Sequence, residues 1–390
     1  MPALPPCPVP GPPPGGLYIH LPFCRSKCSY CAFTSYPCQG EPPAGYLQAL
    51  QQQLVQLASH PLVRELSFAS IYLGGGTPTI FPAAGLAELL ATAFEHLRFT
   101  NQVEITVETN PNTVTPAKLH TLQRAGINRL SIGIQSFSDR VLTASGRSHT
   151  AAEARQAIDL ARQAGFSNLS LDLIYGLPAQ TRAAWQESLE ESLRAKPEHL
   201  SLYELMIEEG TPFAERARQG TLALPAEEEV IEMEALAYRR LAAQGLERYE
   251  IANFARPGRE CRHNLNYWRN GSYVGLGAGA VSYLEGIRLH NVTDPALYEQ
   301  LVLAGRPPYE EAEILPPAGR FRETVIMGLR LLAGISPAEL KERFGWTPQE
   351  YYGPTLDRLL AQGLLTYEQE RLRLTARGLP VANQVLAQLV

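Results

Sequence analysis

The sequence predicts an α/β protein: an open (β/α)6 partial TIM-type barrel, followed by a C-terminal winged-helix-like α+β domain. Two patterns lead to this fold class. From Leu17 to about residue 210, short apolar runs alternate with amphipathic helical segments, which is typical of a parallel sheet covered by helices. From about Phe321 the order changes to helix, turn, helix and a short strand pair, which is typical of a winged helix.

Six strand-like segments define the barrel. They are predicted at 17–21, 70–75, 103–109, 129–135, 168–176 and 199–205. The clearest helical segments between and after them lie at 46–60, 83–97, 151–165 and 181–195. Six strand–helix units suit an open barrel better than a closed barrel of eight units.

The chain divides into four predicted parts. These are a disordered Pro-rich arm at 1–16, a core barrel at 17–210, a barrel extension at 211–318 and the winged-helix-like domain at 319–390. The extension contains a long helix at 226–244 and a Gly- and Asn-rich stretch at 261–286 that we expect to be irregular. The helix that would be the DNA-recognition helix of a winged helix carries little positive charge. We therefore interpret this domain as a packing or docking unit, with DNA binding as the alternative.

Composition argues against several classes of protein. The net charge is −5, from 34 basic and 39 acidic residues, and no Lys/Arg stripe is present, so nucleic acid is not an expected partner. Six cysteines in 390 residues are too few for a disulfide-stabilised scaffold. No run approaches the roughly 20 apolar residues of a membrane span, and the N-terminus lacks signal-peptide features. We expect a cytoplasmic protein, with membrane association only through partners.

Three of the six cysteines lie within eight residues, in the loop directly after the first predicted strand. Cys24, Cys28 and Cys31 have the spacing C-x3-C-x2-C. Three thiolates on a short loop can bind three irons of a [4Fe–4S] cluster and leave the fourth iron open to a ligand. The alternatives are a zinc site, which normally takes four ligands, and buried structural cysteines. Cys7 and Cys38 are interpreted as free thiols.

This spacing, with Tyr30 as the aromatic residue before the third cysteine, resembles the radical S-adenosylmethionine (SAM) superfamily. The resemblance implies that SAM binds the open iron through its amino and carboxylate groups. One electron from the cluster then cleaves a C–S bond of SAM to give an adenosyl radical. The glycine-rich turn GGGTPT at 74–79 resembles the superfamily motif that binds the methionine amino group, here through Gly75, Gly76 and Thr77.

Several polar side chains stand at or near the carboxyl ends of predicted strands, where α/β barrels bind their ligands. They are Glu108, Gln135 and Asp172, together with Arg147 in a following loop. A carboxylate suits the ribose hydroxyls of SAM, and an arginine suits its carboxylate. The alternative is that these groups pair inside the barrel, because burying them unpaired is costly.

In order along the chain, YIHLPFC, GGGTPT, VETNP, GIQSF, GRSHT and DLIYGLP resemble the oxygen-independent coproporphyrinogen III oxidase family. The resemblance runs from about Tyr18 to the C-terminus. By position it implies SAM contacts at Tyr18, Tyr30, Gly75, Gly76, Thr77, Glu108, Gln135, Arg147 and Asp172.

The chain departs from the true oxidases in two places. They carry a further cysteine where this chain has Phe33, and a longer N-terminal segment that shapes the substrate cavity. Both differences match the haem chaperone branch of the family, HemW. The segment HNLNYW resembles the HNxxYW motif of that branch, which is linked to haem binding. The candidate haem-binding residues are therefore His263, Asn264, Tyr267 and Trp268. Cys261 is an alternative ligand for the haem iron. His263 itself could instead be a hydrogen-bonded histidine that packs at the edge of the barrel without binding haem.

The resemblance predicts a haem chaperone that carries a [4Fe–4S] cluster and SAM, binds haem as cargo and transfers it to haem proteins, respiratory ones among them. The alternative is an oxygen-independent coproporphyrinogen III dehydrogenase, which decarboxylates propionate side chains by radical chemistry. Both functions imply a reductant such as flavodoxin or ferredoxin, and a homodimer is compatible with both. A transcriptional role rests only on the winged-helix pattern. No catalytic residue is assigned.

Overall fold

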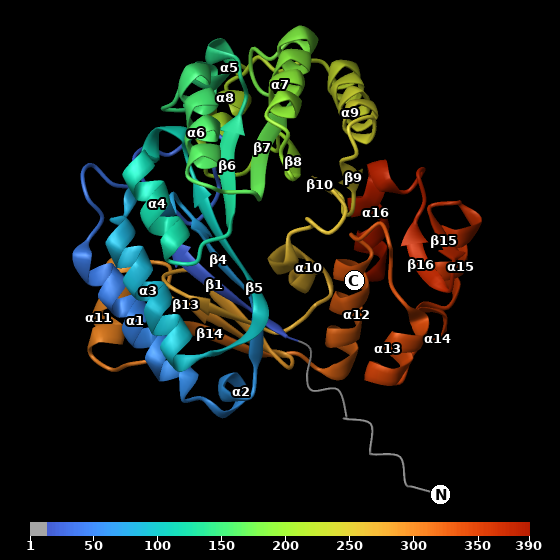
Figure 1. The fold of residues 1–390 in the computed structure, drawn as a ribbon. Helices are drawn as coiled ribbons and strands as arrows, with labels where there is room; N and C mark the ends of the chain where they lie inside the picture. The colour runs from blue at the N-terminus through green and yellow to red at the C-terminus, as the bar shows by residue number, and fades with distance from the viewer. Residues whose placement is uncertain (1–13) are drawn as a thin grey trace, which may run out of the picture.

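The computed structural model describes residues 14–390 of the chain (Figure 1). Residues 1–13, which hold most of the predicted Pro-rich arm and Cys7, lie outside the described residues. The first strand begins at Gly15, so the last two residues of the predicted arm belong to the sheet. Within residues 14–390, no helix has the length and apolar character needed to cross a membrane.

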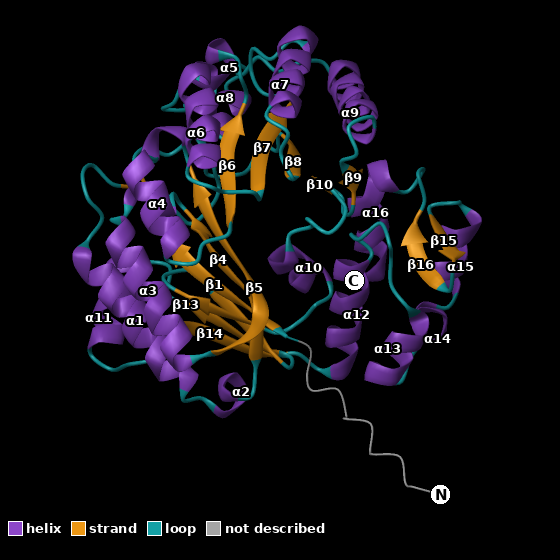
Figure 2. Ribbon diagram, in the orientation of Figure 1, coloured by secondary structure: helices purple, strands orange, loops and turns teal. Residues whose placement is uncertain are grey.

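Six parallel strands form the centre of the sheet, and each coincides with a predicted strand (Figure 2). They are β1 (Gly15–Leu21), β4 (Ser67–Gly75), β5 (Arg98–Thr109), β6 (Arg129–Gln135), β7 (Leu169–Tyr175) and β8 (His199–Glu204). Neighbouring strands pair in this order, with Leu21 opposite Gly75, for example. Their carboxyl ends therefore meet along one rim of an open barrel, which confirms the predicted fold class.

Six further strands extend this sheet at both edges. Beside β1 lie β11 (Tyr273–Leu276), β12 (Val281–Leu284), β13 (Ile287–Asn291) and β14 (Tyr309–Ile314), and beside β8 lie β10 (Asn253–Ala255) and β9 (Glu247–Arg248). The complete order is β14-β13-β12-β11-β1-β4-β5-β6-β7-β8-β10-β9. Only β11 among the added strands runs parallel to its inner neighbour, β1.

The prediction of an irregular stretch at 261–286 is therefore wrong. This stretch contains a short helix, α10 (Arg262–Trp268), and the strands β11 and β12. Each of these strands has only four residues, and Gly277, Gly279 and Gly286 turn the chain with positive φ between or after them. Strands this short show no clear alternation of apolar and polar residues, so the sequence pattern does not reveal them.

Helices cover the outer face of the parallel strands, as the strand–helix alternation predicts (Figure 1). The longer ones are α1 (Ala44–Ala58), α3 (Ala83–His96), α4 (Pro116–Arg124), α6 (Ala151–Gln163), α7 (Arg182–Arg194), α9 (Glu227–Ala242) and α11 (Pro295–Leu303). Shorter helices are α2 (Pro61–Arg64), α5 (Asp139–Ala144) and α8 (Pro212–Arg218). The indole N–H of Trp185, a fully buried residue of α7, donates to the Met233 carbonyl of α9 at 2.8 Å, which joins two outer helices.

The C-terminal residues form a second hydrophobic core, separate from that of the barrel. Its elements are α12 (Pro317–Gly328), α13 (Pro337–Phe344), α14 (Pro348–Tyr352), α15 (Pro354–Ala361), β15 (Leu365–Glu368), β16 (Arg371–Leu374) and α16 (Ala382–Leu386). The strand pair turns through Gln369 and Glu370, both with positive φ. The helices and hairpin agree with the winged-helix-like pattern, although α12 begins at Pro317, so the predicted boundary at residue 319 falls inside this helix.

Candidate functional site

The three clustered cysteines lie in the loop that follows β1, at the carboxyl-terminal rim of the barrel. Two short strands, β2 (Phe23–Cys24) and β3 (Tyr36–Pro37), pair across this loop and close it on itself. Within the loop, the Cys31 N–H donates to the Cys28 carbonyl at 3.2 Å. The cysteines are thus held on one short hydrogen-bonded segment, and each remains partly exposed.

Two of the three sulfurs accept hydrogen bonds from side chains of other elements. Thr77 Oγ1 lies 3.5 Å from Cys24 Sγ, and Arg147 Nη1 lies 3.3 Å from Cys28 Sγ. Burial raises the pKa of Cys24, and its neighbours Cys28 and Cys31 raise it further. Hydroxyl and guanidinium donors stabilise negative charge on sulfur, as ligand thiolates require.

This set of donors fits a [4Fe–4S] cluster. In the part of the chain that the structure describes, no three Cys, His, Asp or Glu side chains converge closely enough to hold a single metal ion. A cubane cluster needs no such convergence, since each thiolate binds a different iron. Three neighbouring thiols, two of them with hydrogen-bond donors at sulfur, therefore suit the cluster better than a mononuclear ion.

Glu108 lies near the end of β5, where two donors hold its carboxylate. The Tyr72 hydroxyl donates to Oε1 at 2.8 Å, and the Gly75 N–H donates to Oε2 at 3.1 Å. Burial raises the pKa of Glu108 to about 7, although both donors and Arg129 oppose this shift. The carboxyl group therefore keeps its proton to a higher pH than an exposed glutamate does, and perturbed pKa values of this kind are common among functional carboxylates.

The other two strand residues differ in how completely they are paired. Asp172 accepts hydrogen bonds from Ser131 at 3.0 Å and Ser170 at 3.3 Å, and burial raises its pKa. Gln135 has a positive φ of 65°, and its Oε1 is buried without a partner among the described residues. Pairing inside the barrel therefore accounts for Asp172 but leaves the Gln135 oxygen available to a ligand.

Arg147 follows α5 and reaches back to the cysteine loop. Its Nη2 donates to the Gly133 carbonyl at 2.6 Å and to the Asn110 side-chain oxygen, while Nη1 donates to Cys28 Sγ. The sequence suggested that this guanidinium meets a ligand carboxylate. The three bonds use both N–H groups of Nη2 but only one of the two of Nη1, which leaves one N–H for that contact. Only Nε is buried without a partner within residues 14–390. Arg147 thus ties the ends of β5 and β6 to the cysteine loop.

The glycine-rich turn supports the cysteine loop directly. Gly75 has a positive φ of 106°. A Cβ at Gly76 would lie 2.5 Å from the Phe23 carbonyl oxygen and 2.8 Å from that of Leu21. The Thr77 N–H donates to the same Phe23 carbonyl at 2.8 Å. Gly76 is therefore required by the close approach of two backbones, whether or not a ligand is bound.

The two predicted tyrosine contacts also lie near the loop. The Tyr18 hydroxyl is 2.8 Å from His20 Nδ1, and His20 Nε2 is 2.8 Å from the Thr34 carbonyl oxygen. The Tyr30 ring packs against Phe213, with ring centroids 6.3 Å apart. Sequence reasoning did not single out His20, although it stands two positions after Tyr18 and so shares its face of β1.

Sequence reasoning also missed Tyr72 and Asn110. Tyr72 holds Glu108, and Asn110 donates to Thr77 Oγ1 at 2.9 Å while accepting from Arg147. Asn110 directly follows β5, so its position at a strand end was an available signal. Tyr72 gave no such signal, because aromatic residues inside strands usually serve packing.

The His263 ring stacks on that of Tyr72, with centroids 5.1 Å apart, beside β1 and β4. It also packs on Gly16, and its two nitrogens are hydrogen-bonded: Nδ1 to Ser70 Oγ at 2.9 Å and Nε2 to the Tyr267 hydroxyl at 3.0 Å. Burial lowers the pKa of His263 to about 3, so the ring is neutral. An axial haem ligand needs one free ring nitrogen, so ligation by His263 requires one of these hydroxyls to leave.

The neighbouring haem candidates are partly or fully enclosed. Cys261 is fully buried, with its sulfur 3.6 Å from Glu104 Oε1. The Arg330 guanidinium lies 4.6 Å from the ring centroid of Trp268, which is partly buried like Asn264. The structure therefore groups the HNLNYW residues on α10, but it does not bring them to the cysteine loop.

The chain matches two family models. The radical SAM superfamily model matches residues 18–191, and the HemN C-terminal domain model matches residues 315–381. Heme chaperone HemW of Bacillus subtilis is 36% identical over 369 residues, which cover 94% of this chain and 97% of the relative. Heme chaperone HemW of Escherichia coli is 35% identical over 378 residues, which cover 96% of this chain and 97% of the relative.

Among solved structures, coproporphyrinogen III oxidase (HemN) from Escherichia coli, a radical SAM enzyme, superposes with a TM-score of 0.82. The superposition covers 96% of this chain and 90% of the other, at 24% identity, and it shows that the two proteins share a fold. The relatives at 35% and 36% identity match nearly the whole chain and define its family. The chain therefore belongs to the radical SAM superfamily and, within it, to the HemW family.

Proposed function

We propose that this protein is a haem chaperone, which carries a [4Fe–4S] cluster and SAM, binds haem and transfers it to haem proteins. One observation carries the choice over the oxidase. At the position where the oxidases have a further cysteine, Phe33 projects from the cysteine loop with 72% of its surface exposed. The Bacillus subtilis and Escherichia coli relatives, which match nearly the whole chain, are likewise named heme chaperones.

In this proposal Cys24, Cys28 and Cys31 hold the cluster, which when bound supplies the electron that reductive cleavage of SAM requires. The surrounding side chains stabilise the negative charge of the cysteine thiolates. Thr77 and Arg147 donate to two of the thiolates and thereby stabilise them against protonation. Arg147 also fixes the loop relative to β6 through the Gly133 carbonyl.

The proposed SAM contacts are the nine residues that the family resemblance implies: Tyr18, Tyr30, Gly75, Gly76, Thr77, Glu108, Gln135, Arg147 and Asp172. Gln135 has the clearest opening for a ligand, since its side-chain oxygen is buried without a partner among the described residues. Glu108 can accept from a ribose diol when it is ionised. Gly76 and Arg147 contribute by holding the rim in place.

The raised pKa of Glu108 predicts a pH-dependent contribution to stability. Its carboxyl group ionises near 4.5 in the unfolded chain and at about 7 in the folded protein. Between pH 4.5 and pH 7, the Glu108 carboxyl group is therefore more protonated in the folded state than in the unfolded state. The ionised group destabilises the fold above pH 7, and this destabilisation disappears as the pH falls toward 4. We expect Glu108→Gln to be more stable than the wild type at pH 8, by up to about 3 kcal/mol, and nearly equal at pH 4. Thermal melts at both pH values check this, and a pH-independent difference would contradict it.

The second candidate function is oxidative decarboxylation of coproporphyrinogen III. The deciding experiment reconstitutes the cluster anaerobically and offers coproporphyrinogen III together with SAM and a reductant such as flavodoxin or ferredoxin. We expect haem binding and no protoporphyrinogen IX. Formation of protoporphyrinogen IX at a rate that requires SAM would overturn the chaperone proposal. Haem transfer is followed separately, by the absorption spectrum of an added apo-haem protein.

Ligation of haem by His263 stays a prediction of the proposal. It requires that Tyr267 or Ser70 gives up its hydrogen bond to the ring. A bound low-spin spectrum that His263→Ala abolishes would support it, whereas an unchanged spectrum would remove His263 from the iron. A homodimer and delivery to respiratory haem proteins are further parts of the proposal.

A further inference from the structure

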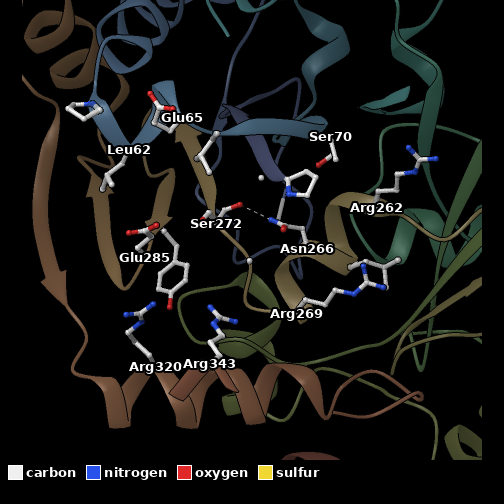
Figure 3. Close-up of a pocket in the computed structure, with 18 residues that line it drawn as sticks. Leu62, Glu65, Ser70, Arg262, Asn266, Arg269, Ser272, Glu285, Arg320 and Arg343 are labelled. Carbon is white, nitrogen blue, oxygen red and sulfur yellow. Dashed lines mark hydrogen bonds between the residues drawn. The ribbon is translucent and has the colours of Figure 1, made fainter. Parts of the chain in front are cut away.

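A cavity of about 1150 Å³ lies between the amino-terminal end of the barrel strands and the C-terminal domain (Figure 3). Its walls come from the start of β1, the segment from α2 to β4, the outer face of α10, the β12–β13 turn, α12 and α13. It is therefore built by parts of the chain that are far apart in sequence. Its volume is slightly above the range of about 300–1,000 Å³ that small-molecule sites usually provide, so a large organic ligand fits it.

The cavity is basic in a chain whose net charge is −5. Its lining contains Arg262, Arg269, Arg320 and Arg343 but only two acidic residues, Glu65 and Glu285. Among residues 14–390, none of these four guanidinium groups lies within 4 Å of a carboxylate, although many other arginines of the chain form such pairs. Figure 3 shows Arg320 and Arg343 side by side at one wall. Each positive charge here is left without an acidic partner.

Two polar atoms in the cavity wall lack partners among the described residues. The hydroxyl of Tyr283 is one of them, on a residue that is only 1% exposed. The other is Nε of Arg320, which is also buried. Buried polar groups are normally hydrogen-bonded, so an unpaired hydroxyl near a guanidinium with an unpaired Nε indicates a missing acceptor. Arg343, beside them, donates from Nη2 to the Asn270 carbonyl at 3.3 Å. The pKa of Arg343 is lowered, by desolvation first and also by the nearby Arg320, as expected for two neighbouring cations without an anion.

The fold fixes the position of Arg320. Its side chain crosses the backbone at Gly286, which has a positive φ of 93°. A Cβ there would lie 2.6 Å from Arg320 Cδ, so only glycine leaves room for this path. On the opposite wall, the Asn266 amide donates to the Ser272 carbonyl at 3.0 Å and holds α10 against the start of β11 (Figure 3).

The remaining wall is apolar and suits a flat organic body better than a simple anion. Leu62, Leu66 and Leu265 line the cavity together with prolines and an alanine. A polyphosphate would gain little from these apolar side chains. A ligand with carboxylates at one edge and an apolar plane behind them matches both parts of the wall.

We propose that this cavity binds haem, with its propionate carboxylates on Arg320, Arg343 and Tyr283 and its macrocycle against the apolar wall. The inference rests on the proposed chaperone function and names the site for its cargo. Leu265, Asn266 and Arg269 of α10 line the cavity, and so does Ser70, whose hydroxyl lies 2.9 Å from His263 Nδ1. The cavity therefore adjoins the histidine that is tested above as an iron ligand.

The test titrates the full-length protein with haem and with haem dimethyl ester, in which both propionates are blocked. Wild type is expected to bind haem about tenfold or more tightly than the ester, because charge-assisted pairs to carboxylate are lost. The Arg320→Gln/Arg343→Gln double variant should lose this preference and bind both ligands with the affinity of the ester. Arg124→Gln, an exposed arginine outside the cavity, serves as the matched control and should behave as wild type.

Tyr283→Phe gives a second variant, which removes only a hydroxyl that has no partner in the described residues. It should keep the wild-type melting temperature and weaken haem binding several-fold. Equal affinities of wild type for haem and its ester, or wild-type haem affinity in the double variant, would overturn the cavity as the haem site while leaving the chaperone function standing. Absence of haem binding by wild type itself would remove both.

Discussion

Replacing Cys24 by alanine should remove most of the iron and acid-labile sulfide from anaerobically reconstituted protein while leaving the fold intact. Cys24 is one of three neighbouring thiols, and a cubane with only two protein thiolates is poorly held. The residue is partly exposed on the loop and does not belong to the main hydrophobic core. We therefore expect the far-UV circular dichroism to be unchanged and SAM binding to be lost together with the cluster.

Cys38→Ala is the matched control, because it makes the same change directly after β3, the short strand that closes the cysteine loop. The Cys38 sulfur lies 3.5 Å from the Glu41 carbonyl oxygen, and its N–H donates to the Cys24 carbonyl through the backbone, which alanine retains. This variant should keep wild-type iron and sulfide. Equal cluster content in both variants would exclude Cys24 as a ligand, and stoichiometric zinc in wild type would exclude the cluster itself.

The central fold could be predicted because buried parallel strands read as near-continuous apolar runs. LYIHL, for example, became β1, and the amphipathic segment at 181–195 became α7. The added edge strands could not be predicted, because β11 and β12 have four residues each and depend on pairing with β1 and β13, which are distant in the sequence. Their register is set by tertiary contacts rather than by local preference.

The cysteine loop could be predicted because its chemistry depends on spacing along the chain. The roles of strand-end residues depend instead on where side chains point, and here the sequence was less informative. Arg147 turned toward Cys28 and the Gly133 carbonyl, and Glu108 is held by Tyr72. The arginine-lined cavity gave no signal at all, since Arg262, Arg320 and Arg343 come from separate segments and each alone reads as surface charge.

Gly76→Ala should destabilise the protein and displace the cysteine loop. The three nearest atoms to a Cβ at this position are backbone atoms, at 2.5 to 2.8 Å, and they belong to Phe23 and Leu21. Backbone cannot rotate away as a flexible side chain can, so the turn after β4 and the start of the loop must separate. Forced overpacking of this kind costs about 1–3 kcal/mol. We expect a melting temperature lower by several degrees, measured on protein without added SAM.

The same displacement should weaken the hydrogen bonds that cross from the turn to the loop. Thr77 donates through its N–H to the Phe23 carbonyl and through its hydroxyl to Cys24 Sγ, so both contacts move with Gly76. Cluster content should therefore fall along with stability, without any change in a ligand atom. Gly319→Ala on α12 is the control, because its nearest neighbour lies at an ordinary 3.4 Å and helical alanine is favourable.

The outcome separates two roles of Gly76. If the glycine only leaves space for SAM, the alanine variant will melt like wild type and retain its cluster, and only SAM affinity will fall. If it allows two backbones to meet, stability and iron content will fall before SAM is added. The distances to Phe23 and Leu21 favour the second result, because they show a clash with the protein itself. A variant with wild-type stability and iron would show that the loop adapts, and would assign the glycine to ligand binding.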